Sequence, residues 1–489
     1  MVNLRVCCAL ICVLIFVDTS LARRSFWRGR GFHEFYGDPT NRPWLKALPA
    51  EEWFEQQVDP FNPTNPGTWK QRYFTNRDFF RPKDGPVFLM IGGEGTASPK
   101  WMVEGAWVHY AKEFGALCFQ VEHRFYGKSH PTTNVTTDDL VYLSSENALA
   151  DLTFFIVEMK KKYHLTDANR WIAFGGSYPG SLAAWLREKY PHLVHGAISS
   201  SGPLLAKIDF REYYDVVTDA IVECREAVRE SIHQVEIQLR TELGKSALKD
   251  QFHLCDPLDT GNSLDMSNFF ENLASIFAGI VQYNGTPRSK HNVDEFCAIM
   301  NNQAKGPALN RLAELNKLIL DDEGTSCLDY KYDRMIKELQ ATTWDAPEVL
   351  NGTRQWTYQT CKEFGFYQTS DNASLVFGDR FPVEFFTRQC TDIFGDRFTA
   401  NSLEKSVYNV NVNYGALETK ATNVIYIHGS VDPWHTLGLT ESNDVHVRTL
   451  FINGTAHCAN MYEPRQEDLP QLREARLTIR NFIKDLLMD

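Results

Sequence analysis

Trp171-Ile-Ala-Phe-Gly175-Gly176-Ser177-Tyr178-Pro179-Gly180 is an apolar run that ends in a glycine-flanked serine. The apolar residues predict a buried strand at 171–174, and the apolar spacing of 181–190 predicts a helix directly after it. A serine on so tight a strand-to-helix turn needs very small neighbours, which the glycines supply. The stretch therefore predicts a nucleophile elbow with Ser177 at its tip, although Pro179 stands where the usual pattern has its last glycine.

Short apolar runs separated by helical stretches lie on both sides of this elbow. Further candidate strands are 86–91, 116–122, 194–199, 424–428 and 447–453, and further candidate helices are 146–163 and 472–487. This alternation is typical of a parallel sheet with helices on its faces.

The middle of the chain has a different pattern. Long helical periodicities occur at 225–243, 268–283 and 307–320. We therefore expect an α/β class protein with an α/β-hydrolase core, built from residues 23–210 and 401–489. A mostly helical cap, residues 211–400, is expected to be inserted into that core.

A serine hydroxyl needs a base, and in an α/β-hydrolase the chain order is serine, acid, histidine. Asp432 follows the candidate strand 424–428, and His457 follows the candidate strand 447–453. The 25 residues between them (457 − 432) accommodate a helix and a strand, so both loops can open at one sheet edge. We expect Ser177, Asp432 and His457 to form a catalytic triad.

Acyl transfer through Ser177 also needs two N–H donors for the developing oxyanion. The N–H of Tyr178 is one candidate. Gly93, in the glycine-rich stretch after the candidate strand 86–91, is the other, with a plain glycine turn as the alternative interpretation. Glu122 and Trp434 are candidate pocket residues, because Glu122 begins a polar stretch at the end of a candidate strand and Trp434 lies beside the acid. A structural ion pair for Glu122 and a core position for Trp434 are equally open.

The N-terminus predicts the secretory pathway. Arg5 precedes the apolar run 6–17, and Ser20-Leu21-Ala22 fits a signal-peptidase site, so residues 1–22 are interpreted as a cleaved signal peptide. The run is too short for a membrane span, which takes about 20 residues.

Cysteine usage agrees with an oxidising compartment. Removing residues 1–22 leaves eight of the eleven cysteines, an even number that favours disulfides. Six of them lie between residues 211 and 400 and are expected to pair among themselves, in a pattern that the sequence does not select. Cys118 and Cys458 are left, either as a pair or as buried thiols.

Glycan acceptor sequences begin at five asparagines: Asn134, Asn284, Asn351, Asn372 and Asn453.

The net charge of −12 disfavours binding to nucleic acid and to anionic membrane surfaces. We find no cysteine or histidine spacing typical of a metal site, and the expected chemistry requires no cofactor. Nothing specifies an oligomeric state, so a homodimer is one option.

Several motifs occur together in one order: Gly-Gly-Ser177-Tyr, Glu122-His-Arg-Phe-Tyr-Gly, Asp432-Pro-Trp and Ala456-His457-Cys458. They resemble the motifs of the prolyl carboxypeptidase and dipeptidyl peptidase II family of serine peptidases. The stretch 355–367 is most similar to the thymus-specific serine protease branch. The sequence departs from the family pattern at Pro179 and at Asn460, where the family often has aspartate.

The resemblance implies an α/β-hydrolase with a helical cap, in a secreted or lysosomal or endosomal serine exopeptidase that favours proline before the scissile bond. We expect this chain to cleave peptides through an acyl-enzyme. Whether it reads the amino or the carboxyl end stays open, because cap residues cannot be positioned from one sequence. An esterase or lipase could use the same elbow and triad, and a non-catalytic binding protein could keep the same fold.

Overall fold

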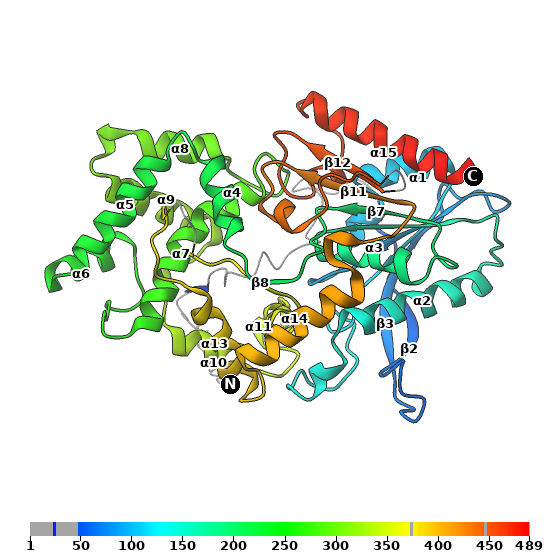
Figure 1. Ribbon diagram of the computed structural model, residues 1–489, viewed down its shortest axis with the longest axis horizontal. Helices are drawn as coiled ribbons and strands as arrows, with labels where there is room; N and C mark the ends of the chain where they lie inside the picture. The colour runs from blue at the N-terminus through cyan, green and yellow to red at the C-terminus, as the bar shows by residue number, and fades with distance from the viewer. Residues whose placement is uncertain (1–22, 26–46, 372–374, 445–446, 489) are drawn as a thin grey trace, which may run out of the picture.

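The computed structural model describes residues 23–25, 47–371, 375–444 and 447–488 (Figure 1). The predicted signal peptide, residues 1–22, and the sequon asparagine Asn372 lie outside these ranges.

An eight-stranded sheet forms the core, in the order β12-β11-β7-β6-β4-β5-β3-β2. The strands from β12 to β5 pair in parallel, whereas β3 is antiparallel to both of its neighbours. From one edge to the other the strands are β12 Arg448–Ile452, β11 Val424–Gly429, β7 Gly196–Ser200, β6 Trp171–Gly176, β4 Val87–Ile91, β5 Leu117–Val121, β3 Thr68–Asn76 and β2 Glu52–Gln57. The predicted α/β class and all six predicted strands are confirmed, whereas β2 and β3 were not predicted.

Both faces of the sheet are buried, as the continuous apolar strands require. In β4, Val87, Leu89 and Ile91 belong to one apolar cluster, and Phe88 and Met90 belong to the other. Helices α2 (Ser145–Lys162) and α3 (Tyr178–Lys189) pack on the first face. Helices α1 (Ala106–Phe114) and α15 (Pro470–Met488) cover the second.

Between β7 and β11 the chain is mostly helical, and Figure 1 shows many of these helices gathered as a lobe beside the sheet. They are α4 Glu212–Ala220, α5 Arg225–Gln238, α6 Glu242–Gln251, α7 Ser263–Gln282, α8 Val293–Asn301, α9 Ala308–Glu323, α10 Tyr332–Leu339, α11 Pro347–Leu350, α12 Thr353–Gln359, α13 Val383–Phe394 and α14 Ala400–Tyr414. Two short parallel pairs accompany them: β8 (Lys207–Asp209) with β10 (Gly365–Tyr367), and β1 (Arg23–Ser25) with β9 (Cys327–Asp329). We call this helical segment the cap; it includes α14, which begins where the expected insertion, residues 211–400, ends.

Three disulfides link Cys224 to Cys297, Cys255 to Cys327, and Cys361 to Cys390. The prediction that the six cap cysteines pair among themselves is confirmed. Cys118 and Cys458 are unpaired and buried, which decides between the two alternatives that the sequence left open.

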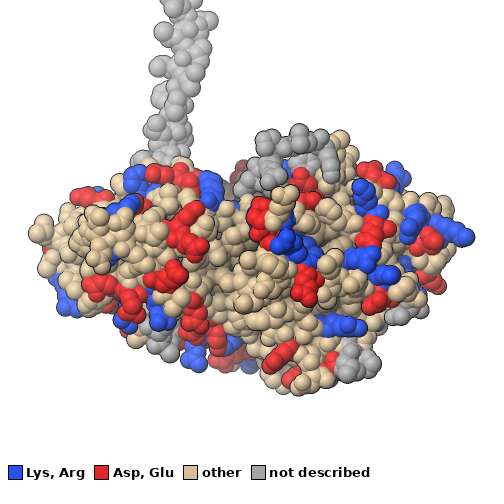
Figure 2. All heavy atoms as spheres, turned by 90° about the horizontal axis from the view of Figure 1, so that it is seen from above, with Lys and Arg blue, Asp and Glu red and all other residues tan. Residues whose placement is uncertain are grey.

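The surface carries charges of both signs. On the face in Figure 2, basic and acidic side chains are interspersed, without an extended basic patch among the described residues. Within the described ranges, no helix combines the length and apolarity needed to cross a membrane. The predicted glycan acceptors Asn134, Asn351 and Asn453 are exposed, and Asn284 is half-buried.

Candidate active site

Ser177 lies on the turn between β6 and α3, in a backbone conformation that side chains rarely adopt (φ 59°, ψ −133°). Its N–H donates to the carbonyl of Ser200 at 2.8 Å. A Cβ on Gly175 would lie 1.9 Å from the Pro179 carbonyl oxygen, and one on Gly180 would lie 2.8 Å from the Ser200 oxygen. The turn therefore requires glycine at both positions, whereas Pro179 fits because the first turn of a helix needs no N–H from it.

Asp432 and His457 follow the ends of β11 and β12, and their side chains meet. Asp432 Oδ1 lies 2.6 Å from His457 Nδ1 and accepts the N–H of Trp434 at 3.0 Å. Both side chains are fully buried. Burial disfavours the charged carboxylate, yet the adjacent His457 ring and the Ser201 hydroxyl keep the pKa of Asp432 below its usual value. An ionised aspartate that accepts from Nδ1 fixes the tautomer and the orientation of the imidazole. Nε2 is then the ring nitrogen that can take a proton.

The end of β7 joins the histidine loop to the serine elbow. The N–H of Cys458 donates to Ser201 Oγ at 2.9 Å, next to Ser200, which holds the Ser177 N–H. A Cβ on Gly176 would lie 2.8 Å from Cys458 Sγ, so the elbow and the histidine loop are in direct contact. Burial and the nearby Asp432 raise the pKa of the Cys458 thiol well above its usual value, which makes this cysteine a poor nucleophile.

One candidate oxyanion donor lies in the elbow, and the other follows the neighbouring strand β4. Tyr178 is the first residue of α3, and its buried hydroxyl lies 3.1 Å from His123 Nε2 and accepts from Gln359 Nε2 at 3.1 Å. Gly93 follows β4, whose Met90 pairs with Phe174 of β6. Gly93 and Ser177 each lie three residues beyond this pair (93 − 90 and 177 − 174), so they leave the sheet at the same level.

Trp434 lies beside the acid and is 3% exposed. Its ring centroid is 5.3 Å from those of Phe210 and Phe366, 6.0 Å from that of Tyr213 and 6.4 Å from that of His457. The acid and base thus adjoin a cluster of aromatic rings.

Glu122 is the predicted pocket residue that the geometry does not support. Its fully buried carboxylate forms an ion pair with Arg72 and accepts from the N–H groups of Ala97 and Lys128, each at 3.0 Å, and from Ser129 Oγ at 2.8 Å. These partners occupy both oxygens, so we correct the prediction: Glu122 holds strands and loops together instead of facing a substrate.

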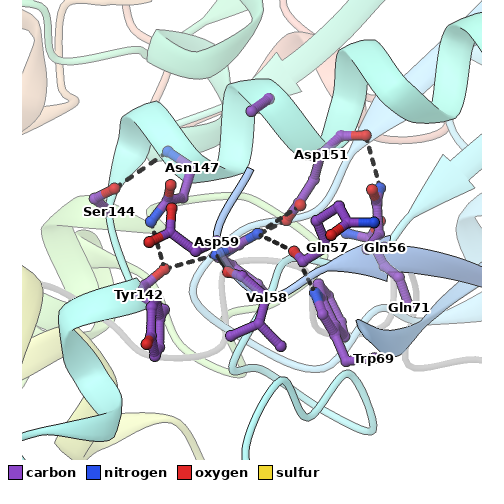
Figure 3. Close-up of polar contacts among 12 residues, drawn as sticks. Gln56, Gln57, Val58, Asp59, Trp69, Gln71, Tyr142, Ser144, Asn147 and Asp151 are labelled. Carbon is purple, nitrogen blue, oxygen red and sulfur yellow. Dashed lines mark hydrogen bonds and ion pairs between the residues drawn. The ribbon is translucent and has the colours of Figure 1, made fainter. Parts of the chain in front are cut away.

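Arg124 in the same motif is also structural. It pairs with Asp151 and donates to the carbonyl oxygens of Tyr142 and Val58. Figure 3 shows these partners within a wider network in which Gln56 donates to the Asp151 carbonyl at 2.8 Å. The polar motif therefore fixes α2 to β2, the edge strand of the sheet.

The sequence did not indicate two further residues near the site. Gln282 closes the apolar helix α7, and its carbonyl accepts the N–H of His457 at 3.0 Å. Glu94 follows Gly93 and is 2% exposed. The only available signal was a polar residue that ends an apolar helix for Gln282, and a carboxylate in the glycine-rich turn after a buried strand for Glu94.

Comparisons with known proteins agree with this arrangement. The family model described as serine carboxypeptidase S28 matches residues 56–479. A putative serine protease of Caenorhabditis elegans is 36% identical over 454 residues, covering 89% of this chain and 84% of that protein. The thymus-specific serine protease of Homo sapiens is 34% identical over 450 residues, covering 89% and 86%. The lysosomal Pro-X carboxypeptidase of Pongo abelii is 26% identical over 490 residues, covering 96% and 95%.

These matches extend over most of the chain and confirm the resemblance that the motifs indicated. We conclude that the chain belongs to the serine carboxypeptidase S28 family of serine peptidases.

Proposed function

We propose that this protein is a serine exopeptidase that cleaves peptides through an acyl-enzyme on Ser177. The observation that carries the proposal is the buried contact of 2.6 Å between Asp432 and His457, beside a serine on a strained elbow. An esterase could use the same groups, but the family is one of peptidases.

In the proposed reaction, His457 Nε2 takes the proton of Ser177 Oγ as this oxygen attacks the scissile carbonyl carbon. The N–H groups of Tyr178 and Gly93 stabilise the oxyanion of the tetrahedral intermediate. The C–N bond then breaks, and the leaving amine receives the proton from His457. Water, deprotonated by His457, attacks the acyl-enzyme, which releases the new carboxylate and regenerates Ser177.

Burial of the site supports action on chain ends. Ser177 is 4% exposed and His457 is fully buried, with the cap residue Gln282 bonded to the histidine loop. A cap bonded to the catalytic loops restricts the access of a folded chain to Ser177, which supports action on peptide ends.

A preference for proline before the scissile bond is part of the proposal. Its support is the name of a relative, the lysosomal Pro-X carboxypeptidase, which is similar to this chain over nearly its whole length.

A luminal location is part of the proposal. The three cap disulfides are stable in an oxidising compartment, and three of the glycan acceptor asparagines are exposed. A lysosomal relative fits secretion or delivery to lysosomes and endosomes.

The test is mass spectrometry of a peptide mixture, with free or blocked termini and with or without proline near each end. Wild type should remove terminal residues, preferentially after proline, and Ser177→Ala should not. Ser181→Ala is the matched control, because Ser181 lies one turn later on α3 and its hydroxyl donates to the Pro203 carbonyl at 2.7 Å. Turnover of acyl esters with every peptide left intact would refute the peptidase proposal.

A further inference from the structure

Gln282 is the point at which the cap reaches the catalytic loops. It is the last residue of α7, a helix buried along nearly its whole length, and it is itself fully buried. The residues that it contacts come from α4 and from the loops that carry the acid and the base.

Gln282 accepts three hydrogen bonds from these elements. Its main-chain carbonyl accepts the N–H of His457 at 3.0 Å. Its side-chain Oε1 accepts the hydroxyl of Tyr213 at 2.7 Å and the indole N–H of Trp434 at 3.1 Å. Its Nε2 donates to the hydroxyl of Tyr283 at 3.2 Å.

The chemistry of the partners fixes the orientation of this amide. An indole N–H can only donate, so the side-chain oxygen and not the nitrogen must face Trp434. A flipped amide would set two donors against each other in a buried place, which is costly. Tyr213 fills the second acceptor position on Oε1, so the amide has only one orientation in which its hydrogen bonds are all made.

These contacts close a ring of hydrogen bonds through the acid and the base. Trp434 donates its main-chain N–H to Asp432 Oδ1 at 3.0 Å and its indole N–H to Gln282. His457 meets the same Asp432 oxygen through Nδ1 and donates its main-chain N–H to Gln282. The cap residue therefore fixes the two loops relative to each other.

We propose that Gln282 is a positioning residue that sets the geometry of the Asp432–His457 pair from the cap. This inference rests on the proposed function. Misplacement of a catalytic group by about 1 Å can cost on the order of 100-fold in rate. Loss of the Gln282 side-chain bonds should therefore slow the reaction at Ser177 more than it weakens substrate binding.

The test compares Gln282→Met with wild type by the rate at which a fluorophosphonate labels Ser177, and by kcat and KM on a cleaved peptide. Methionine keeps the length and the main-chain bond to His457 but removes the acceptor for Trp434 and Tyr213. We expect labelling and kcat to fall by about tenfold or more, with KM changed by less than about threefold. Gln282→Glu retains acceptor oxygens and should recover most of the loss.

Gln389→Met is the matched control. Gln389 is a fully buried cap glutamine on α13 whose side-chain nitrogen and oxygen make no hydrogen bond, so its labelling rate should stay within about twofold of wild type. Tyr213→Phe is a milder second probe, because it removes only one of the two donors to Gln282 Oε1 and should slow labelling by about two- to fivefold.

If the fluorophosphonate labels wild type, and Gln282→Met and Tyr213→Phe are labelled at the same rate, this inference is overturned and the proposed function is not. An effect on KM without an effect on kcat, or an equal loss in Gln389→Met, would also overturn it. Absence of labelling in folded wild type would instead refute the proposed function.

Discussion

Replacing Glu94 with glutamine should stabilise the protein at neutral pH but not at acidic pH. Glu94 lies directly after Gly93, is 2% exposed, and has one carboxylate oxygen without a hydrogen-bond partner. Burial raises the pKa of Glu94 from 4.5 to about 8, although its own backbone N–H and the charge of Arg288 act in the opposite direction.

The magnitude follows from proton binding. Between pH 4.5 and about 8 the folded carboxyl holds a proton that the unfolded chain releases, so the stability of the wild type falls as pH rises through this window. Each pH unit lowers the free energy of unfolding by about 1.4 kcal/mol, and the loss reaches about 3 kcal/mol at pH 7. A glutamine does not titrate and escapes this cost.

Thermal unfolding of both proteins at about pH 4.5 and pH 7 measures the effect. An unfolding entropy of about 2 cal/mol/K per residue converts 3 kcal/mol into about 3 °C for a chain of this size. Any difference in packing between the two side chains is present at both pH values and cancels in the comparison. If the Tm difference between variant and wild type were the same at both pH values, the reasoning would be refuted.

Three further predictions follow from other contacts. Asp432→Asn should lower kcat about 10⁴-fold, because His457 Nδ1 loses the carboxylate that fixes its tautomer; a loss below tenfold in steady-state kinetics would contradict this. Glu122→Gln should destabilise the fold by about 3 kcal/mol in denaturant unfolding, because the buried Arg72 loses its buried counter-charge and keeps only the partly exposed Glu51 as an acidic partner. Its kcat should be unchanged, and a lower kcat without lower stability would return Glu122 to the substrate pocket. Replacing Cys255 and Cys327 with serine should cost about 2–5 kcal/mol, and an unchanged denaturation midpoint would count against it.

The central strands were predictable because parallel strands covered on both faces must be apolar throughout. All five residues of β4 are buried and apolar, and the run stands out without any alignment. In contrast, β3 contains Gln71 and Arg72, which are buried only because Glu122 and its neighbours satisfy them in three dimensions. No pattern along the chain reports such pairing, so β3 and its neighbour β2 were missed.

Helix ends show the same limit. The apolar periodicity of 225–243 predicted one helix, but the chain forms α5 and α6 with a break before Thr241. The hydroxyl of Thr241 caps α6 by accepting the N–H of Gly244 at 3.1 Å. Periodicity continues across a break of this kind, whereas a threonine followed by Glu242 was a local start signal.

The residues predicted for the triad came from chain order and strand ends, which the sequence displays. The contacts of Gln282 could not be found in this way, because its side-chain partners Tyr213 and Trp434 lie 69 and 152 residues away. Glu122 was ambiguous in the sequence, since a carboxylate after a strand suits a pocket and an ion pair equally well.

The most direct test of the account is to label the folded protein with a fluorophosphonate and to map the modified residue by peptide mass spectrometry. The account predicts a single adduct on Ser177, absent in Ser177→Ala and retained in Ser181→Ala. An adduct on another residue, or none on folded wild type, would contradict the claim that Ser177, Asp432 and His457 form a working triad.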